Sequence, residues 1–438
     1  MLSPRRLPGL LVATGAVMAV ALAGSGMAAD APAPVPVTLE SAARDAVAWH
    51  PSVIEAAGTL AASGEDVAAA RAGYLPTISG GLGSGYDSRV SGTWSPRPQF
   101  SASQMLFDFG KVSSDVAAAR AGTRASRAEM LLAVDTLVRD TAYAIIELQR
   151  ATAQRIIARD QADRIRQISE LVGQRSTMGA ATRSDALQAQ ARVEAAEASL
   201  TQVEAEERRW TSNLAFLLGH PAPAGVSADV PGWLMQGCAG PAPSWQSVPA
   251  VAAADAETER AAANLRRSRA DRYPTVSFGG DASTDVNSPF GDRSIYNFGL
   301  RVSSNIFAGG LTKARVRSAA YRLDAAEASA RRIRNESSQQ LAEAQQQIDS
   351  LSRLVTTLAS REDNMRETGR LYRIQYLEMG TRTLVDLLNA EQELQQVRFD
   401  AVNTTQNLRR LQIDCLYVSG RMRDAFGLSG TSVRGVTL

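Results

Sequence analysis

Two stretches of sequence decide the fold: GAATRSDALQA at residues 179–189 and GTRTLVDLLNA at residues 380–390. Glycine, aspartate, leucine and alanine recur in register, and Gly179 and Gly380, the predicted turn glycines, are 201 residues apart. Two further pairs of motifs occupy matching positions upstream: LPTIS at 75–79 with YPTVS at 273–277, and LFDFG at 106–110 with IFAGG at 306–310. The chain is therefore an internal duplication, with one structural unit in each half.

The first 29 residues predict a secretory signal peptide. An arginine pair precedes an apolar run from Leu10 to Ala23, and small residues follow. This run is shorter than the roughly 20 residues that cross a bilayer as a helix. We therefore favour cleavage after Ala28 or Ala29 over an uncleaved anchor. No cysteine lies near this point, so we expect no lipid anchor on the mature amino terminus.

Charge and composition argue against nucleic-acid binding and against catalysis. The chain has 47 basic and 45 acidic residues, and the signal peptide removes two arginines and no acid, which leaves a formally neutral mature chain. Nucleic-acid binding needs a concentrated positive surface. His50 and His220, the only histidines, each precede a proline, and no metal-spaced cluster, nucleophile elbow or phosphate-binding glycine loop occurs. We expect no nucleic-acid partner, no metal, no cofactor and no enzymatic activity.

Each half contains two stretches that predict β-strands. Beyond the signal peptide no apolar run approaches a membrane helix, so a membrane role would require strands. The alternation is clearest where Tyr296, Phe298 and Leu300 alternate with Asn297 and Arg301. The predicted strands cover residues 75–88, 97–108, 273–286 and 295–308. Their length suits tilted transmembrane strands.

The alternative for these strands is a soluble sheet with one wet face. Each segment taken alone gives only a weak signal for a membrane strand. Aromatic residues near the strand ends, such as Trp94 and Phe290, are typical of interfacial girdles. Together with the export signal, they favour a membrane sheet.

Long helices follow each strand pair. Residues 111–178 and 311–379 are polar, rich in alanine and glutamine and free of proline, and their apolar residues step by three and four. Such narrow seams are typical of coiled coils, and each helix would be about 100 Å long at 1.5 Å per residue. Shorter helices are expected at 181–219 and 381–420.

The repeats define the domain organisation. We expect a first repeat at 30–220, a proline-rich linker at 221–250, a second repeat at 251–424 and a loose tail at 425–438. Cys238 lies in the linker, and Cys415 continues an apolar heptad row of the last helix. The sequence allows two interpretations: the two cysteines form a disulfide, or Cys415 is a free, buried thiol.

Four strands cannot close a barrel, and open edges in lipid leave backbone groups unsatisfied. Several chains must therefore pool their strands. Two chains would give eight strands with a nearly filled interior, whereas three would give twelve and a pore. The residues by themselves do not fix this number.

The signal peptide, the duplicated strand–strand–long helix–short helix unit, the LFDFG motif at 106–110 and above all GTRTLVD at 380–386 resemble the TolC family of outer-membrane secretion and efflux channels. The resemblance covers nearly the whole mature chain. It implies a membrane α+β fold: a homotrimer with a 12-stranded transmembrane β-barrel, four strands per chain, continuous with a coiled-coil α-helical tunnel through the periplasm.

The resemblance also implies partners. The periplasmic tip would meet a membrane-fusion adaptor and an inner-membrane pump, either an ABC transporter or a proton-driven one. The missing lipidation cysteine is similar to the branch that serves type I secretion. We therefore expect the exit duct of a tripartite export system for proteins, small molecules or both. The alternative is an exported coiled-coil structural or adhesin-like protein that conducts nothing.

A gate at the helix tips is implied by the same resemblance. Asp386 from three chains would form a ring that attracts cations, and Asn389 stands where the family has a second acidic ring. Arg382 corresponds to the arginine that links the closed tip, Asp185 to an aspartate that does the same, and Ser184 to a hydroxyl partner of the arginine.

This chain departs from the family pattern at one further gate position. Leu377 occupies the place of an expected tyrosine, with Tyr376 beside it. The local alternative for Asp185 and Asp386 is that they only stabilise the starts of exposed helices, where a carboxylate contributes about 0.3–1 kcal/mol.

Overall fold

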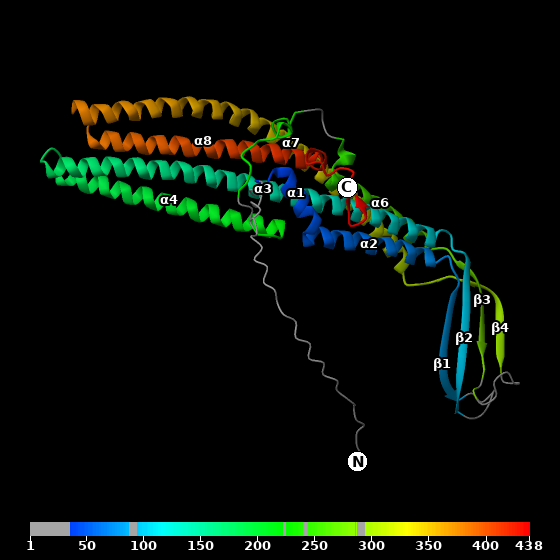
Figure 1. Cartoon of the computed structure of the whole chain (residues 1–438). Helices are drawn as coiled ribbons and strands as arrows, with labels where there is room; N and C mark the ends of the chain where they lie inside the picture. Colours follow the sequence, from blue (N-terminus) through cyan, green and yellow to red (C-terminus); the bar gives the residue numbers. More distant parts are fainter. Residues whose placement is uncertain (1–35, 87–93, 222–224, 240–243, 285, 287–293) are drawn as a thin grey trace, which may run out of the picture. The chain divides into compact units, whose positions relative to one another are not determined.

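The computed structural model describes residues 36–86, 94–221, 225–239, 244–284, 286 and 294–438, and residues 36–438 form one unit (Figure 1). The predicted signal peptide and Phe290 lie outside the described residues. No described helix is both long enough and apolar enough to cross a membrane.

Four antiparallel strands form one sheet in the order β1-β2-β3-β4, with bounds Thr77–Tyr86, Trp94–Phe107, Thr275–Ser283 and Ile295–Ser303. β2 begins three residues earlier than predicted, because Trp94 pairs with Tyr86. β4 ends at Ser303 and not at residue 308, since its partner β3 begins at Thr275 and offers nothing further to pair with.

The two faces of this sheet differ in polarity. Ser79, Ser101, Asp281 and Asn297 share one row across the four strands, and the hydroxyls of the two serines lie 2.6 Å apart. The opposite face carries exposed apolar side chains; Phe298 is 83% exposed. We call this the apolar face of the sheet: Ile78, Leu82, Phe100, Phe278, Tyr296, Phe298, Leu300 and Val302.

A tight turn leads from each strand pair into a long helix. Phe109 and Gly110 have φ of 58° and 89°, and in the second repeat Gly309 and Gly310 have φ of 57° and 83°. Phe109 is unusual here, because residues other than glycine rarely adopt this left-handed conformation. Asp108 supports the turn, because its carboxylate accepts backbone hydrogen bonds of 2.9 and 2.6 Å from residues at the start of the helix.

Two helical hairpins extend from these turns (Figure 1). The first joins α3 and α4, and the second joins α7, the π-helical turn η2 and α8; their bounds are Lys111–Thr177, Arg183–Leu218, Leu311–Ile374, Gln375–Met379 and Leu384–Val418. α3 also packs against α2, Pro51–Ala72, and α6, Pro249–Ala270. At 1.5 Å per residue, α3 is about 100 Å long.

The α3 side of the structure holds the main apolar core. It combines α1, Leu39–Trp49, with α3, α4, α8 and the short helices α5, Gly232–Met235, and α9, Met422–Ala425. The carboxyl-terminal tail, predicted to be loose, is packed, because Phe426 and Leu428 are buried. A short hairpin follows, with strands of two residues each: β5, Ser432–Val433, and β6, Val436–Thr437. Phe426 packs against Trp233, and the centroids of their two rings are 4.8 Å apart.

The segment between the repeats is tied to the last long helix. It contains α5 and a short 3₁₀ turn, Trp245–Ser247, before α6 begins at Pro249. Cys238 and Cys415 form a disulfide with their Cα atoms 5.2 Å apart. Of the two interpretations that the sequence left open, the structure has the disulfide. Cys415 is also fully buried.

Candidate functional site

The hairpin turns at the ends of α3 and α7 carry the residues that the sequence singled out. Gly179 and Gly380 have φ of 75° and 62°, a left-handed conformation that ends a helix at little cost only for glycine. The backbone N–H of Ala180 donates to the carbonyl of Arg175 at 2.7 Å, which closes the first turn. The two glycines therefore fix where each chain direction reverses.

Each turn is followed by a capping box that engages its aspartate. Thr182 and Asp185 exchange hydrogen bonds of 3.1 Å between side chain and backbone at the start of α4. Thr383 and Asp386 do the same at 3.3 and 3.2 Å at the start of α8. Thr182 and Thr383 are the N-caps, worth about 0.5–2 kcal/mol each, and both aspartate carboxylates have the local role of completing a capping box.

An apolar cluster holds the two tips together. Its buried members come from α3, α4, η2 and α8: Ile165, Ile168, Val172, Ala189, Val193, Tyr376, Leu384, Leu387 and Leu388. Both hairpins contribute, so the tips pack as one body within the chain.

Arg175 and Tyr376 form the polar link between the hairpins. The guanidinium of Arg175 lies over the ring of Tyr376, 5.2 Å from its centroid, and donates to the Tyr376 carbonyl at 3.3 Å. Burial raises the pKa of the Tyr376 phenol; the nearby Arg175 opposes this shift and Asp185 adds to it. Sequence reasoning missed Arg175 altogether, although it stands 201 residues before Tyr376, the repeat spacing.

Arg382 turns back onto its own hairpin. Its guanidinium lies 4.5 Å from the ring centroid of Tyr372, and its Nε donates to Gln375 at 3.2 Å. Ser184 bonds with the hydroxyl of Thr182 at 2.8 Å. Within one chain, the structure therefore does not bring Arg382 to Ser184 or Asp185.

Asn389 is held by an arginine that the sequence did not single out. Arg192 of α4 donates to Asn389 at 3.3 Å and to Gln392 at 2.6 Å, both on α8. A neutral amide here accepts from Arg192 without adding a charge. No periodic signal in the sequence points to this contact between the repeats.

A charged network lies further along the hairpins. Asp160 accepts from Arg164 at 2.6 Å and from Arg398 at 2.5 Å. Burial alone would raise the pKa of Asp160, but these hydrogen bonds outweigh it and hold the pKa below its usual range. Glu391 is buried with Arg164 at 3.8 Å, and burial raises its pKa. The Asp160–Arg164 spacing of four residues could have been read from the sequence.

Comparison with known proteins places this fold among outer-membrane channels. A family model described as outer membrane efflux protein matches residues 42–220 and 244–414, well over half of the chain. The outer membrane efflux protein BepC of Brucella suis biovar 1 is 23% identical over 380 residues, covering 83% of this chain and 81% of the relative.

Solved structures agree with the family match. The outer membrane protein VceC of Vibrio cholerae superposes with a TM-score of 0.77 at 18% identity, covering 87% of this chain and 96% of VceC. The open-state MtrE outer membrane channel of Neisseria gonorrhoeae gives a TM-score of 0.72 at 19% identity, covering 87% and 88%. The resemblance drawn from the repeated turn motif is confirmed: this chain belongs to the outer membrane efflux protein family, the TolC-type channels of the outer membrane.

Proposed function

We propose that three copies of this chain join their sheets into one twelve-stranded barrel and form the exit duct of a tripartite export system. The observation that best supports this proposal is the apolar face of the sheet. Side chains such as Phe298 and Leu300 are 83% and 70% exposed in the single chain. A soluble monomer rarely exposes a continuous apolar surface of this kind, and lipid is a fitting environment for it.

The opposite face of the sheet suits the inside of a pore. Its row of Ser79, Ser101, Asp281 and Asn297 is polar throughout. β1 and β4 each pair on one side only within the described sheet. Pairing these edges between subunits satisfies the backbone in lipid, and twelve strands leave an open lumen.

The helix tips are the proposed gate. Asp386 from three subunits forms a cation-attracting ring, and Asn389 in place of a second acid makes the cation preference weaker than a double ring would give. Ser184, Asp185 and Arg382 lie on the same turns, and their remaining hydrogen-bonding groups link neighbouring subunits when the tip is closed. The stacking of Arg382 on Tyr372 keeps the guanidinium at the tip.

The tip is also the proposed meeting point with a periplasmic adaptor, and through it with an inner-membrane ABC or proton-driven pump. The cargo is protein, small molecule or both. A strain lacking this chain, tested for protein secretion and for drug sensitivity, separates the two cargo classes.

The assembly is tested by fractionation and conductance. We expect a heat-modifiable trimer in outer-membrane fractions that conducts ions in planar bilayers. The pair of substitutions Arg382→Ser and Asp185→Ala should raise conductance, while Arg370→Ser, at an exposed arginine paired with Glu367 on α7, should not. A monomer that extracts without detergent and conducts nothing would instead support the structural or adhesin-like alternative.

A further inference from the structure

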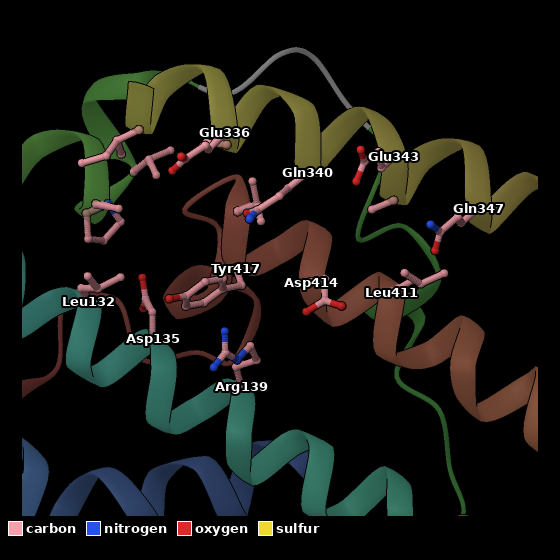
Figure 2. A pocket seen from close by; sticks show the side chains of 17 residues that line it. Leu132, Asp135, Arg139, Glu336, Gln340, Glu343, Gln347, Leu411, Asp414 and Tyr417 are labelled. Carbon is pink, nitrogen blue, oxygen red and sulfur yellow. The ribbon is translucent and has the colours of Figure 1, made fainter. Parts of the chain in front are cut away.

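A cavity of about 610 Å³ lies between α3 and α7, where α8 ends and α6 begins (Figure 2). α8 ends at Val418, and α6 begins at Pro249, directly after Val248. All three residues line the cavity, and neither helix fills the space at this junction. The volume is within the range of about 300–1,000 Å³ typical of small-molecule sites.

A buried carboxylate in this cavity has an unused oxygen. Asp135 of α3 is only 1% exposed, and its Oδ2 accepts from Arg423 at 3.1 Å. No described group donates to Oδ1, although buried polar atoms are nearly always hydrogen-bonded. The side chain points into the space between the helices (Figure 2).

The remaining charges around the cavity are mainly acidic. Asp414 of α8 and Glu343 of α7 line it with Asp135. Asp414 accepts from Tyr143 and lies near the charges of Arg139 and Arg410, whereas Glu343 accepts from the neutral amide of Gln339 at 2.8 Å. Glu336 also lines the cavity, but Arg332 binds it at 2.8 Å.

Arg139 is the one basic residue among the lining residues, and it is already engaged. It donates to Asp140 at 3.0 Å, and its guanidinium lies 4.5 Å from the ring centroid of Tyr417. Apolar side chains complete the wall: Leu132, Val248, Pro249, Ile333, Leu411 and Val418. The cavity therefore joins an acidic patch to an apolar surface.

We propose that this cavity binds a small organic cation, a protonated amine or amidine with an apolar body. The N–H donors of such a group satisfy Oδ1 of Asp135 and reach the carboxylates of Asp414 and Glu343, while the body packs on the apolar wall. A quaternary ammonium lacks the N–H donor and fits less well.

Two other ligand classes fit the cavity poorly. No group of three or more His, Cys, Asp or Glu side chains in the described chain is arranged to hold a metal ion. An anion would meet the carboxylates and find few donors at the start of α6. There, Pro249 has no N–H, and the N–H groups of Val251 and Ala252 donate to the Val248 carbonyl.

The electrostatics of Asp135 support a cationic ligand. Burial raises its pKa to about 7, Arg423 opposes this shift and Asp424 adds to it. A bound cation stabilises the ionised carboxylate, so affinity should rise between pH 6 and 8. The charged and titratable groups around Asp135 are Arg139 on α3, Glu336 and Glu343 on α7, Asp414 and Tyr417 on α8, and Arg423 and Asp424 on α9.

Calorimetric titration of the purified full-length protein tests the site. At pH 7.5 we expect saturable binding of 2-phenylethylamine, one per chain, and at least about fivefold weaker binding of 2-phenylethanol and of the N,N,N-trimethyl analogue. Glu343→Gln should weaken amine binding roughly tenfold, and Leu411→Trp should abolish it by filling the cavity. The measurement does not depend on whether the chain conducts.

The matched control is Glu327→Gln, at an acidic residue of the same helix that lies outside the cavity and pairs with Arg331. It should leave binding unchanged. The proposal is overturned if the alcohol binds as well as the amine, if Leu411→Trp has no effect, or if Glu327→Gln weakens binding as much as Glu343→Gln.

Discussion

The link between Arg175 and Tyr376 should control how easily the two hairpins separate at the tip. Arg175→Ala removes a cation–π contact of 5.2 Å and a charged hydrogen bond of 3.3 Å. The first contributes about 0.5–1 kcal/mol at a partly exposed site. The second contributes about 1.5 kcal/mol, the low end for a charged donor, because the bond is long. We therefore expect separation to become easier by about 2 kcal/mol, a factor of about 30 in the population of separated tips.

Two readouts follow this change. Native-state hydrogen exchange in residues 165–193 should show the opening free energy falling by about 2 kcal/mol, and single-channel recordings should show a higher open probability. Tyr376→Phe keeps the ring and the carbonyl and should behave as the wild type. Tyr376→Leu keeps only the carbonyl and should open about two- to fivefold more than the wild type.

Arg370→Ala is the matched control, since this arginine lies on α7 with an exposed partner, Glu367. It should change neither readout. If Arg175→Ala leaves exchange unaltered, the link does not hold the hairpins. If Tyr376→Phe opens the tip as much as Arg175→Ala, the hydroxyl carries the effect and the ring argument is wrong.

Three further predictions concern stability and membrane insertion. Replacing Cys238 and Cys415 by serine should lower the free energy of unfolding by up to about 5 kcal/mol, the loop-closure value for a sequence separation of 177 residues; equal denaturation midpoints for the variant and the oxidised wild type would contradict this. Burial raises the pKa of Asp135 in the fold to about 7, well above the usual range of an aspartate. The folded state therefore holds the proton to higher pH than the unfolded state, and stability is lost as pH rises through 7, by up to about 1.4 kcal/mol per pH unit. Asp135→Asn should flatten this slope in melts from pH 5 to 8, and an unchanged slope would refute the assignment. Phe298→Arg should cost roughly 2–4 kcal/mol of membrane stability and reduce the trimer in outer-membrane fractions, whereas Ser101→Arg on the polar face should not; equal effects would refute the assignment of the two faces.

Local chemistry made the secondary structure readable from the sequence. Gly179 and Gly380 mark the turns because few other residues adopt their backbone conformation at so little cost. The strands were found from their alternation, since one face of the sheet is polar and the other apolar. Helix starts were predicted two or three residues early, because Thr182 and Thr383 act as caps and the helices begin after them.

Contacts between distant segments could not be read in the same way. The bond between Cys238 and Cys415 crosses 177 residues, and the heptad row around Cys415 fits a free, buried thiol equally well. Phe426 is buried against Trp233, yet the sequence around it has the composition of a loose tail. Such pairings depend on how the helices are packed, which periodicity along a single helix does not encode.

The two repeats differ where they meet, and the reason is physical. Gly179 and Gly380, like the two capping aspartates, can be identical because each serves its own turn. Arg175 and Tyr376 occupy equivalent positions and contact each other, so identical residues there would place two guanidinium groups or two phenols against one another. A pair of arginines would repel, and a pair of tyrosines would lack a cation for the ring. Divergence at this position replaces a contact between two like side chains by a contact between a cation and an aromatic ring. The two hairpins, which arose by duplication, can therefore pack together at one tip.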